Sequence, residues 1–301
     1  MPTVVEKQPI IFDTFIRDGT LYLVSTYWST SKPKVNVSVD GFKVEEHGLN
    51  QGEPVRYFSC KVNNVADLRI RVNGLLHRVK PSIVVVPLKV KKRFAIATLF
   101  KHESPALIRR FLEYYRKQGC DAFYLYYNGP VLPNDMPFGT DIYYRLWNFP
   151  YFNKTHDYIH CAQMTFLTTV RFRHFEDCNW LALIDMDEII YNLDNGCSLI
   201  DYIERCNDYD VIKLQNHWST CPQSGGPITY SLIGNGWSIR TKCIYNRRFT
   251  GTFSIHEPKT SCKILCCDEL KLLHVVDGVH DERLGWVLPP VCTTNNNLIA
   301  V

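Results

Sequence analysis

The chain contains 301 residues, of which 46% are hydrophobic and 21% are charged, and its formal net charge is +4. This composition is typical of a globular protein with room for one large domain or two modest ones. The mild positive charge suits a phosphate-bearing ligand, but the chain has no dense basic run of the kind found in nucleic-acid-binding proteins. No stretch approaches the roughly 18 apolar residues of a membrane helix. We therefore expect neither a nucleic-acid partner nor an integral membrane segment in this chain.

Residues 1–92 are expected to form a small β-rich region. Four segments alternate in polarity or are rich in β-branched and aromatic residues, with Gly, Asn, Asp and Pro between them. These segments are Thr20–Tyr27, Lys34–Val39, Val55–Cys60 and Leu68–Val72. No segment with helical spacing intervenes, so we predict an antiparallel sheet or sandwich without a catalytic constellation. A joint near residues 81–93 then leads into a second domain over residues 93–301.

The pattern changes at Phe94, where a strand, a helix and a second strand follow one another. Phe94–Phe100 is a buried-strand run, and Ser104 with Pro105 is a helix start because Ser caps the first turn and Pro fits the first helical position. Apolar residues then recur at helical spacing up to Gly119, and Ala122–Tyr127 is the second strand. A strand–helix–strand unit predicts a parallel sheet. The first strand-to-helix turn lacks GxGxxG and GxxxxGK[ST], which argues against a dinucleotide oxidoreductase and a P-loop NTPase.

Further elements of the same kind follow. We predict strands over Asp141–Leu146 and Asp210–Gln215, and helices over about 157–174 and Ser198–Cys206. After Trp218 the pattern weakens and becomes glycine-rich. The fold class that results is α/β, with a mixed or parallel nucleotide-binding sheet flanked by helices and preceded by the β-rich region.

The stretch Trp180–Tyr191 is the strongest functional signal. Five apolar residues run into Asp185, Asp187 and Glu188, so we expect a buried strand with the two aspartates on one side of its end. Paired carboxylates suit a hard divalent cation such as Mn²⁺ or Mg²⁺, which commonly adds substrate phosphates to its ligands. In open α/β sheets, ligands bind beyond the carboxyl ends of the strands. The stretch therefore predicts a metal and a phosphorylated ligand at the sheet edge.

These features resemble a GT-A glycosyltransferase and, more narrowly, glycosyltransferase family 92. The resemblance covers about residues 93–280. It rests on Lys101-His-Glu103, the helix over 105–118, the strand ending in Asn128, Gln163, the Trp180–Ile189 run, Lys242-Cys-Ile244, His256 and His274. The chain departs from the family pattern at His102, Ile189 and the triplet that begins at His274, where a Tyr and an Arg are missing.

The resemblance implies inverting transfer of a sugar, often galactose or a related sugar such as xylose, from a UDP-sugar to a glycan hydroxyl, with fucose as one acceptor. A glycan or glycoprotein acceptor and a UDP-sugar donor are the implied partners, and Mn²⁺ or Mg²⁺ is the implied cofactor. Because the sequence shows neither a signal peptide nor a membrane helix, we expect a cytoplasmic location, or a Golgi-lumenal one if an anchor has been removed.

The residues expected at the site fall into three groups. The metal ligands are Asp187, Asp185, directly or through water, and His274. The expected nucleotide contacts are Lys101, Glu103, Asn128, Gln163, Asp185, Arg240, Lys242 and His256. An inverting reaction also needs a carboxylate base on the acceptor hydroxyl. The candidates are Asp281, which we favour narrowly, Glu282 and Glu257.

Two other classes remain open. A metal-dependent nucleotidyltransferase acting on sugar phosphates also fits an acidic strand end, but it releases pyrophosphate and lacks an acceptor base. A non-enzymatic carbohydrate-binding protein fits if the β-rich region dominates. A glycoside hydrolase fits poorly, because its two carboxylates flank the scissile bond at about 5–10 Å and Asp185 and Asp187 are too close in sequence for that.

Overall fold

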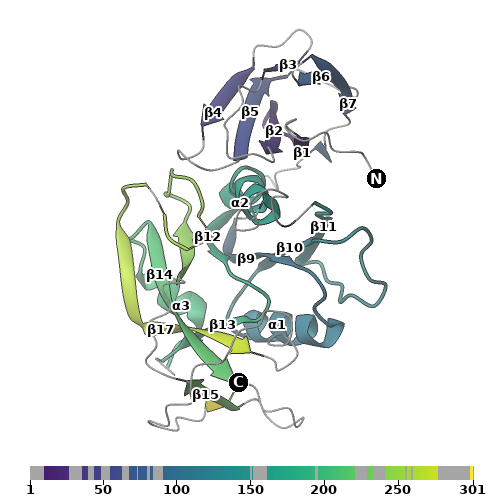
Figure 1. Ribbon diagram of the computed structural model, residues 1–301. Helices are drawn as coiled ribbons and strands as arrows, with labels where there is room; N and C mark the ends of the chain where they lie inside the picture. The colour runs from purple at the N-terminus through teal and green to yellow at the C-terminus, as the bar shows by residue number, and fades with distance from the viewer. Residues whose placement is uncertain are drawn as a thin grey trace.

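A computed structural model describes most of the chain. The described residues are 10–26, 36–39, 44–48, 55–62, 68–72, 74–79, 82–83, 91–149, 151, 161–193, 196–220, 229–233, 241–254, 256–258, 260–276 and 299–300. Their architecture is mixed α/β, as expected, with one large sheet, a few helices and a β-rich N-terminal region (Figure 1). Among the described residues, no helix is long and apolar enough to cross a membrane.

A ten-stranded mixed sheet organises the larger part of the chain. Its main path runs β11-β10-β9-β12-β16-β14-β15-β18, and β17 pairs with both β14 and β13. The first four strands of this path are parallel, as the strand–helix–strand pattern predicted, whereas β16 is antiparallel to β12 and to β14. The strands are β9 Lys92–Phe100, β10 Ala122–Tyr127, β11 Ile142–Leu146, β12 Cys178–Leu183, β13 Glu188–Asn192, β14 Val211–Thr220, β15 Thr229–Ile233, β16 Thr241–Asn246, β17 Ile264–Val276 and β18 Ile299–Ala300.

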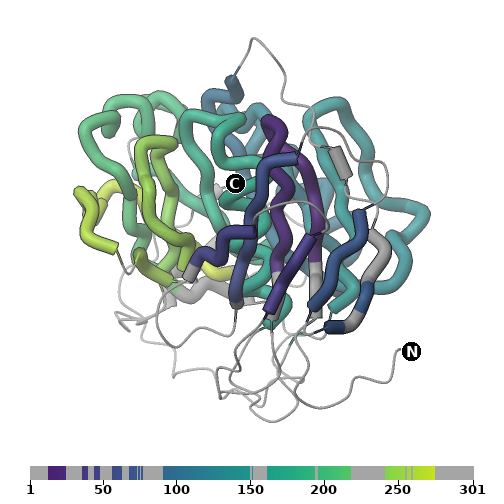
Figure 2. Tube along the Cα trace, turned by 90° about the horizontal axis from the view of Figure 1, so that it is seen from above, coloured from purple at the N-terminus to yellow at the C-terminus, as the bar shows by residue number. Residues whose placement is uncertain are grey.

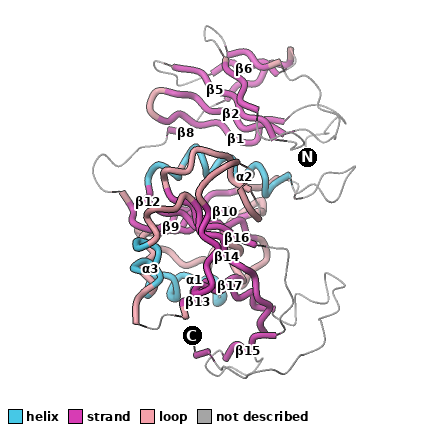
Figure 3. Tube along the Cα trace, turned by 90° about the vertical axis from the view of Figure 1, so that its left-hand side faces the viewer, coloured by secondary structure: helices cyan, strands magenta, loops and turns pink. Residues whose placement is uncertain are grey.

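Alternation along the central strands divides the core of this sheet in two. Phe94, Ile96 and their equivalents on β10 and β12 face α1 and α3, whereas Ala95 and Ala97 face α2. This is the two-residue period of a strand that is buried on both faces. The helices are α1 Pro105–Lys117, α2 Cys161–Arg173, the 3₁₀ turn η1 Phe175–Asp177 and α3 Leu199–Arg205. Figure 3 shows the resulting layers, with α2 above the sheet and α1 and α3 below it.

The predicted caps determine where the helices begin. The Ser104 side chain accepts a hydrogen bond from the Leu107 amide at 3.2 Å, and Pro105 is the first residue of α1. Ser198 and Asp201 form a reciprocal capping box at the start of α3. Such caps satisfy backbone N–H groups that the helix itself leaves without a partner.

The N-terminal region contains two further sheets. The five-stranded sheet has the order β4-β5-β2-β1-β8, and the three-stranded sheet has the order β3-β6-β7. Leu21, Leu23, Phe58, Ile70 and other apolar side chains form a common core for them. The strands are β1 Ile10–Arg17, β2 Thr20–Thr26, β3 Val37–Val39, β4 Glu45–Gly48, β5 Val55–Lys61, β6 Leu68–Val72, β7 Leu75–Val79 and β8 Ser82–Ile83.

Helix α2 is packed on both sides. Its residues Ala162 and Phe166 belong to the core of the large sheet, whereas Met164 and Phe172 pack toward the N-terminal strands. Figure 2, seen from above, shows the purple N-terminal strands lying over the larger part of the chain. The described residues place no strand in both parts. The division at residues 92 and 93 stays a prediction, because separate sheets alone do not establish independent folding units.

Buried ion pairs reinforce this contact. Arg17 binds Asp177 at 2.7 Å, and Asp13 binds Arg145 and, at 3.5 Å, Arg173. A carboxylate buried without a cation would be strongly unfavourable, so Asp13 depends on these arginines.

Candidate functional site at the carboxyl edge of the parallel strands

The parallel strands deliver the predicted polar residues to one edge of the large sheet. Lys101 and Glu103 follow β9, Asn128 follows β10, and Asp185 follows β12. Because β9, β10 and β12 run parallel, their carboxyl ends lie together. Ligands of open α/β sheets bind at this edge.

The two aspartates lie beyond the strand and not on it. Strand β12 ends at Leu183, residues 184–187 form a turn, and β13 begins at Glu188. The expectation that strand alternation aligns Asp185 and Asp187 was therefore wrong. The strand is shorter than its apolar run because the chain turns to pair with β17 instead of continuing along β9 and β16.

Glu188, the first residue of β13, directly follows residues 184–187, which are called the acidic turn because they carry Asp185 and Asp187. Its residue is 1% exposed, and its Oε2 accepts a hydrogen bond from the Asp185 amide at 2.7 Å. Burial alone would raise the pKa of Glu188, but Lys242 and His274 outweigh burial and hold the pKa below the ordinary glutamate value. Glu188 is therefore an ionised carboxylate inside the protein.

Lys242 of β16 is the cation of this cluster. Its ammonium contacts Asp185 and lies 3.1 Å from Glu188 Oε2, and its residue is 7% exposed. Leu183 pairs with Cys243, so the register places Lys242 opposite the start of the turn. Burial alone would lower the pKa of Lys242, but the two carboxylates raise it above the ordinary lysine value. Lys242, expected at the diphosphate, is thus bound to acidic side chains here.

His274 of β17 lies on the other side of Glu188. The two residues are cross-strand partners, with His274 Nδ1 3.5 Å from Glu188 Oε1 and His274 Nε2 3.2 Å from Asp187 Oδ2. Burial alone would lower the pKa of His274, but the neighbouring carboxylates of Asp187 and Glu188 raise it to about 10. The structure therefore brings together Asp187 and His274, two of the three expected metal ligands, from distant parts of the sequence.

The donor atoms of Asp187 and His274 fit a divalent cation. Two ligands bound at about 2.1 Å in adjacent octahedral positions lie about 3 Å apart, close to the 3.2 Å between Asp187 Oδ2 and His274 Nε2. Within the described ranges, no group of three or more His, Cys, Asp or Glu side chains is arranged as a complete metal site. A cation here would therefore take its remaining ligands from water or from a bound phosphate, as Mg²⁺ commonly does.

Glu103 lies close enough to the acidic turn to be affected by its charges. Its Oε2 atom is buried and accepts no hydrogen bond within the part of the chain that the structure describes. Burial, followed by the charges of Asp187 and Asp185, raises the pKa of Glu103 to about 7. The preceding His102 has a φ of 69°, a left-handed conformation that is uncommon for a residue with a side chain.

Tyr151 is a neighbour that the sequence did not single out. Burial, and then the negative charge of Asp185, raises the pKa of Tyr151 to about 12. Its hydroxyl lies 3.5 Å from Gln163 Oε1 on α2. This residue therefore brings Gln163 to the vicinity of the acidic turn. No spacing or motif distinguishes Tyr151 from the other 16 tyrosines of the chain.

The remaining expected residues have other surroundings. Asn128 is buried and donates hydrogen bonds to the carbonyl oxygens of Trp147 at 2.7 Å and Phe149 at 2.8 Å. His256 is exposed, with Nδ1 3.2 Å from the Thr241 carbonyl oxygen.

Of the candidate bases, only Glu257 can be placed. Its carboxylate accepts a hydrogen bond from Lys213 at 2.6 Å. Arg240, Asp281 and Glu282 lie outside the described residues. Their predicted roles stay predictions.

Comparison with known proteins identifies the family. A search of curated proteins returns no match. The sequence model of glycosyltransferase family 92 matches residues 93–273, which is more than half of the chain and spans β9, the acidic turn and most of β17. The sheet edge, the acidic turn and this match agree, and the chain belongs to glycosyltransferase family 92.

Proposed function

We propose that this glycosyltransferase is metal-dependent and inverting, and that it moves galactose, or a related sugar such as xylose, from a UDP-sugar to a glycan hydroxyl. Family membership supports a sugar donor and a glycan acceptor. The observation that supports metal dependence is the juxtaposition of Asp187 Oδ2 and His274 Nε2, 3.2 Å apart, beside Asp185 and Glu188. The family resemblance makes a fucose-bearing glycan one candidate acceptor.

The metal would be Mn²⁺ or Mg²⁺, held by Asp187 and His274, with Asp185 reaching it through water or holding the ribose. When bound, such a cation acts as a Lewis acid on the diphosphate oxygens of the leaving group. His274 must lose its proton to bind a metal, because an imidazolium has no lone pair to donate. Lys242, which is bound to Asp185 and Glu188, would add a second positive charge near those oxygens.

Glu103 is the best supported of the proposed nucleotide contacts. It combines a buried oxygen that lacks a hydrogen-bond partner within the described residues with a pKa of about 7. Such a carboxyl group can accept a hydrogen bond when ionised and donate one when protonated, both near neutral pH. A nucleoside that satisfied this oxygen would remove the cost of a buried, unsatisfied polar atom. Lys101, Asn128, Gln163, Arg240 and His256 complete the proposed nucleotide-binding set.

The catalytic base must deprotonate the acceptor hydroxyl on the side opposite the leaving group. The hydrogen bond with Lys213 lowers the pKa of Glu257, which weakens that carboxylate as a base. We therefore keep Asp281 as the favoured base and Glu282 as the second candidate. Replacing the true base by its amide should reduce turnover about 100-fold or more while donor binding is retained.

Binding of UDP in the presence of Mn²⁺ tests the metal site. Asp187→Ala should abolish the Mn²⁺-stimulated part of UDP binding, measured by titration calorimetry, while the variant stays folded. Asp268→Ala on β17 is the matched control, because it removes the same charge from a side chain that is 98% exposed. Unchanged Mn²⁺-stimulated affinity in Asp187→Ala would refute the assignment.

The reaction products separate this proposal from a nucleotidyltransferase. A glycosyltransferase of this type releases UDP, whereas a nucleotidyltransferase acting on a sugar phosphate releases pyrophosphate. Phosphorus NMR of the reaction mixture distinguishes the two. Proton NMR of the new glycosidic bond then reports its anomeric configuration, and retention of the donor's configuration would contradict inversion.

A further inference from the structure

Glu188 contacts three groups from different parts of the fold, namely the acidic turn, β16 and β17. Its Oε2 accepts from the Asp185 amide at 2.7 Å and lies 3.1 Å from Lys242 Nζ on β16. Its Oε1 lies 3.5 Å from His274 Nδ1 on β17. The two oxygens of one buried carboxylate therefore connect the turn after β12 with two strands that follow much later in the chain.

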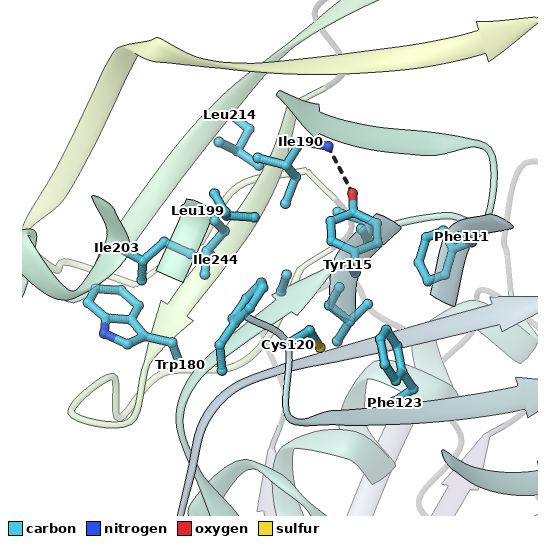
Figure 4. Close-up of a cluster of buried hydrophobic side chains, with 14 of the residues drawn as sticks. Phe111, Tyr115, Cys120, Phe123, Trp180, Ile190, Leu199, Ile203, Leu214 and Ile244 are labelled. Atoms are coloured by element: carbon cyan, nitrogen blue, oxygen red, sulfur yellow. Dashed lines mark hydrogen bonds between the residues drawn. The ribbon is translucent and has the colours of Figure 1, made fainter. Parts of the chain in front are cut away.

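The backbone at Glu188 is fixed independently from helix α1. The Tyr115 hydroxyl donates to the Glu188 carbonyl oxygen at 3.1 Å and accepts from the Ile190 amide at 2.8 Å. Figure 4 shows the hydroxyl group of Tyr115 directed at Ile190 from within the apolar cluster. The Tyr114 hydroxyl donates to the Ile190 carbonyl oxygen at 2.8 Å. These hydrogen bonds fix the backbone position of Glu188, so its side chain can hold its partners in fixed positions.

We propose that Glu188 is a positioning residue, which orders the turn carrying Asp185 and aims Nε2 of His274 at the metal position beside Asp187. The second half of this inference rests on the metal site proposed above. Glu188 Oε2 is bound by the Asp185 amide and Lys242, and Glu188 Oε1 faces His274 Nδ1 at 3.5 Å, so we assign Glu188 to positioning these groups and not to binding the metal.

The chemistry of imidazole explains how Glu188 could direct Nε2 of His274 at the metal position. A neutral imidazole carries one proton, and a carboxylate beside Nδ1 keeps that proton there, which leaves the lone pair of Nε2 for a metal. Carboxylate partners of this kind also fix the plane of the ring, and their loss typically weakens metal binding 10–100-fold.

Glu188→Gln tests the orientation of His274. An amide keeps the size of the side chain, and its oxygen can still accept from the Asp185 amide and Lys242. Its NH₂ group then faces His274 Nδ1 and favours the tautomer with the proton on Nε2, which blocks metal binding. Mn²⁺ affinity, measured without any sugar nucleotide from the electron paramagnetic resonance signal of unbound Mn²⁺, should fall 10–100-fold.

Glu188→Ala tests the order of the turn in metal-free protein. It removes the acceptor of the Asp185 amide, so hydrogen exchange in the peptide spanning residues 184–190 should become faster. Asp13→Asn is the matched control for both measurements. It alters another buried carboxylate, 5% exposed and bound by Arg145 and Arg173 at the N-terminal contact, and should lower stability without changing Mn²⁺ affinity or exchange in this peptide.

Each half of the inference has its own refutation. If Glu188→Gln binds Mn²⁺ within twofold of the unmodified protein, the His274 half is wrong. If Glu188→Ala leaves exchange in the turn unchanged, the ordering half is wrong. If the unmodified protein itself binds no Mn²⁺, the proposed metal site and the His274 half both fail, while exchange still decides the ordering half. If Glu188→Gln does not fold, Glu188→Asp replaces it, because the shorter side chain keeps the charge but cannot reach both partners, and the same twofold criterion applies.

Discussion

Tyr115→Phe should destabilise the protein by removing two hydrogen bonds without changing the packing of the ring. Tyr115 is 0% exposed, and its ring packs against Phe111 at a centroid distance of 4.7 Å. Its hydroxyl accepts from the Ile190 amide and donates to the Glu188 carbonyl oxygen. Phenylalanine retains the ring and loses both bonds, so the measured difference reports on the hydroxyl.

The expected loss of unfolding free energy depends on the state in which the substitution leaves the two backbone partners of the Tyr115 hydroxyl. The Ile190 amide is left buried without its acceptor, because Ile190 is 0% exposed and its N–H group donates to the Tyr115 hydroxyl that the substitution removes. An unsatisfied buried donor costs about 1–3 kcal/mol, and an ordinary hydrogen bond contributes about 0.5–1.5 kcal/mol. The sum for the two groups is about 1.5–4.5 kcal/mol.

Urea denaturation followed by circular dichroism measures this free energy of unfolding. Tyr114→Phe is the matched control, because the neighbouring tyrosine is only partly buried and the substitution removes its donation to the Ile190 carbonyl oxygen without leaving a buried amide unpaired there. That control should cost about 0.5–1.5 kcal/mol. The reasoning is refuted if Tyr115→Phe costs less than about 0.5 kcal/mol or no more than the control.

Two further predictions concern the glycine after α1 and an ion pair at the sheet edge. Gly119→Ala should lower the melting temperature of the protein more than Gly74→Ala. Both glycines have a positive φ, 87° and 85°, but only at Gly119 would the new Cβ lie 2.2 Å from another atom, Ile200 Cγ2. Equal decreases in melting temperature would contradict this prediction. Asp141→Asn should destabilise at neutral pH, because the hydrogen bonds from Arg116 at 2.6 and 2.8 Å lower the pKa of Asp141. A carboxylate whose pKa is lowered by folding stabilises the folded state at pH values above its unfolded pKa of 3.8. This stabilisation is lost as the pH falls through the folded pKa. The difference in unfolding free energy between Asp141→Asn and the unmodified protein should therefore vanish in acid, and a difference that persists there would refute the prediction.

The local patterns of the sequence were sufficient for the first half of the large sheet. The predicted strand over Ala122–Tyr127 has those limits in the structure, and the predicted helix over 105–118 ends one residue earlier, at Lys117. These elements depend on neighbours in sequence, namely the Ser104 cap and the spacing of apolar residues, so a reading of short windows captures them.

The long strand β17 escaped prediction because its sequence lacks a clear period. It runs over Ile264–Val276, with Asp268, Glu269 and Lys271 breaking the apolar pattern, and its pairing with β14 shifts register partway. Helix α2 was predicted from its apolar residues, but its role as a layer between two sheets was not, because nothing in a helix sequence says which partner covers each side.

The sequence by itself determined the family resemblance, the strand–helix–strand unit and the acidic triplet Asp185, Asp187 and Glu188, because each is carried by residues close together in the chain. Only the tertiary structure decided how the triplet is used. It ends β12 before the aspartates, brings Lys242 to Asp185 from 57 residues away, and pairs Glu188 with His274 across β13 and β17. Ion pairs of this kind depend on sheet register and burial, which set the distance between charges and the cost of leaving them unpaired, and neither quantity is encoded in local spacing.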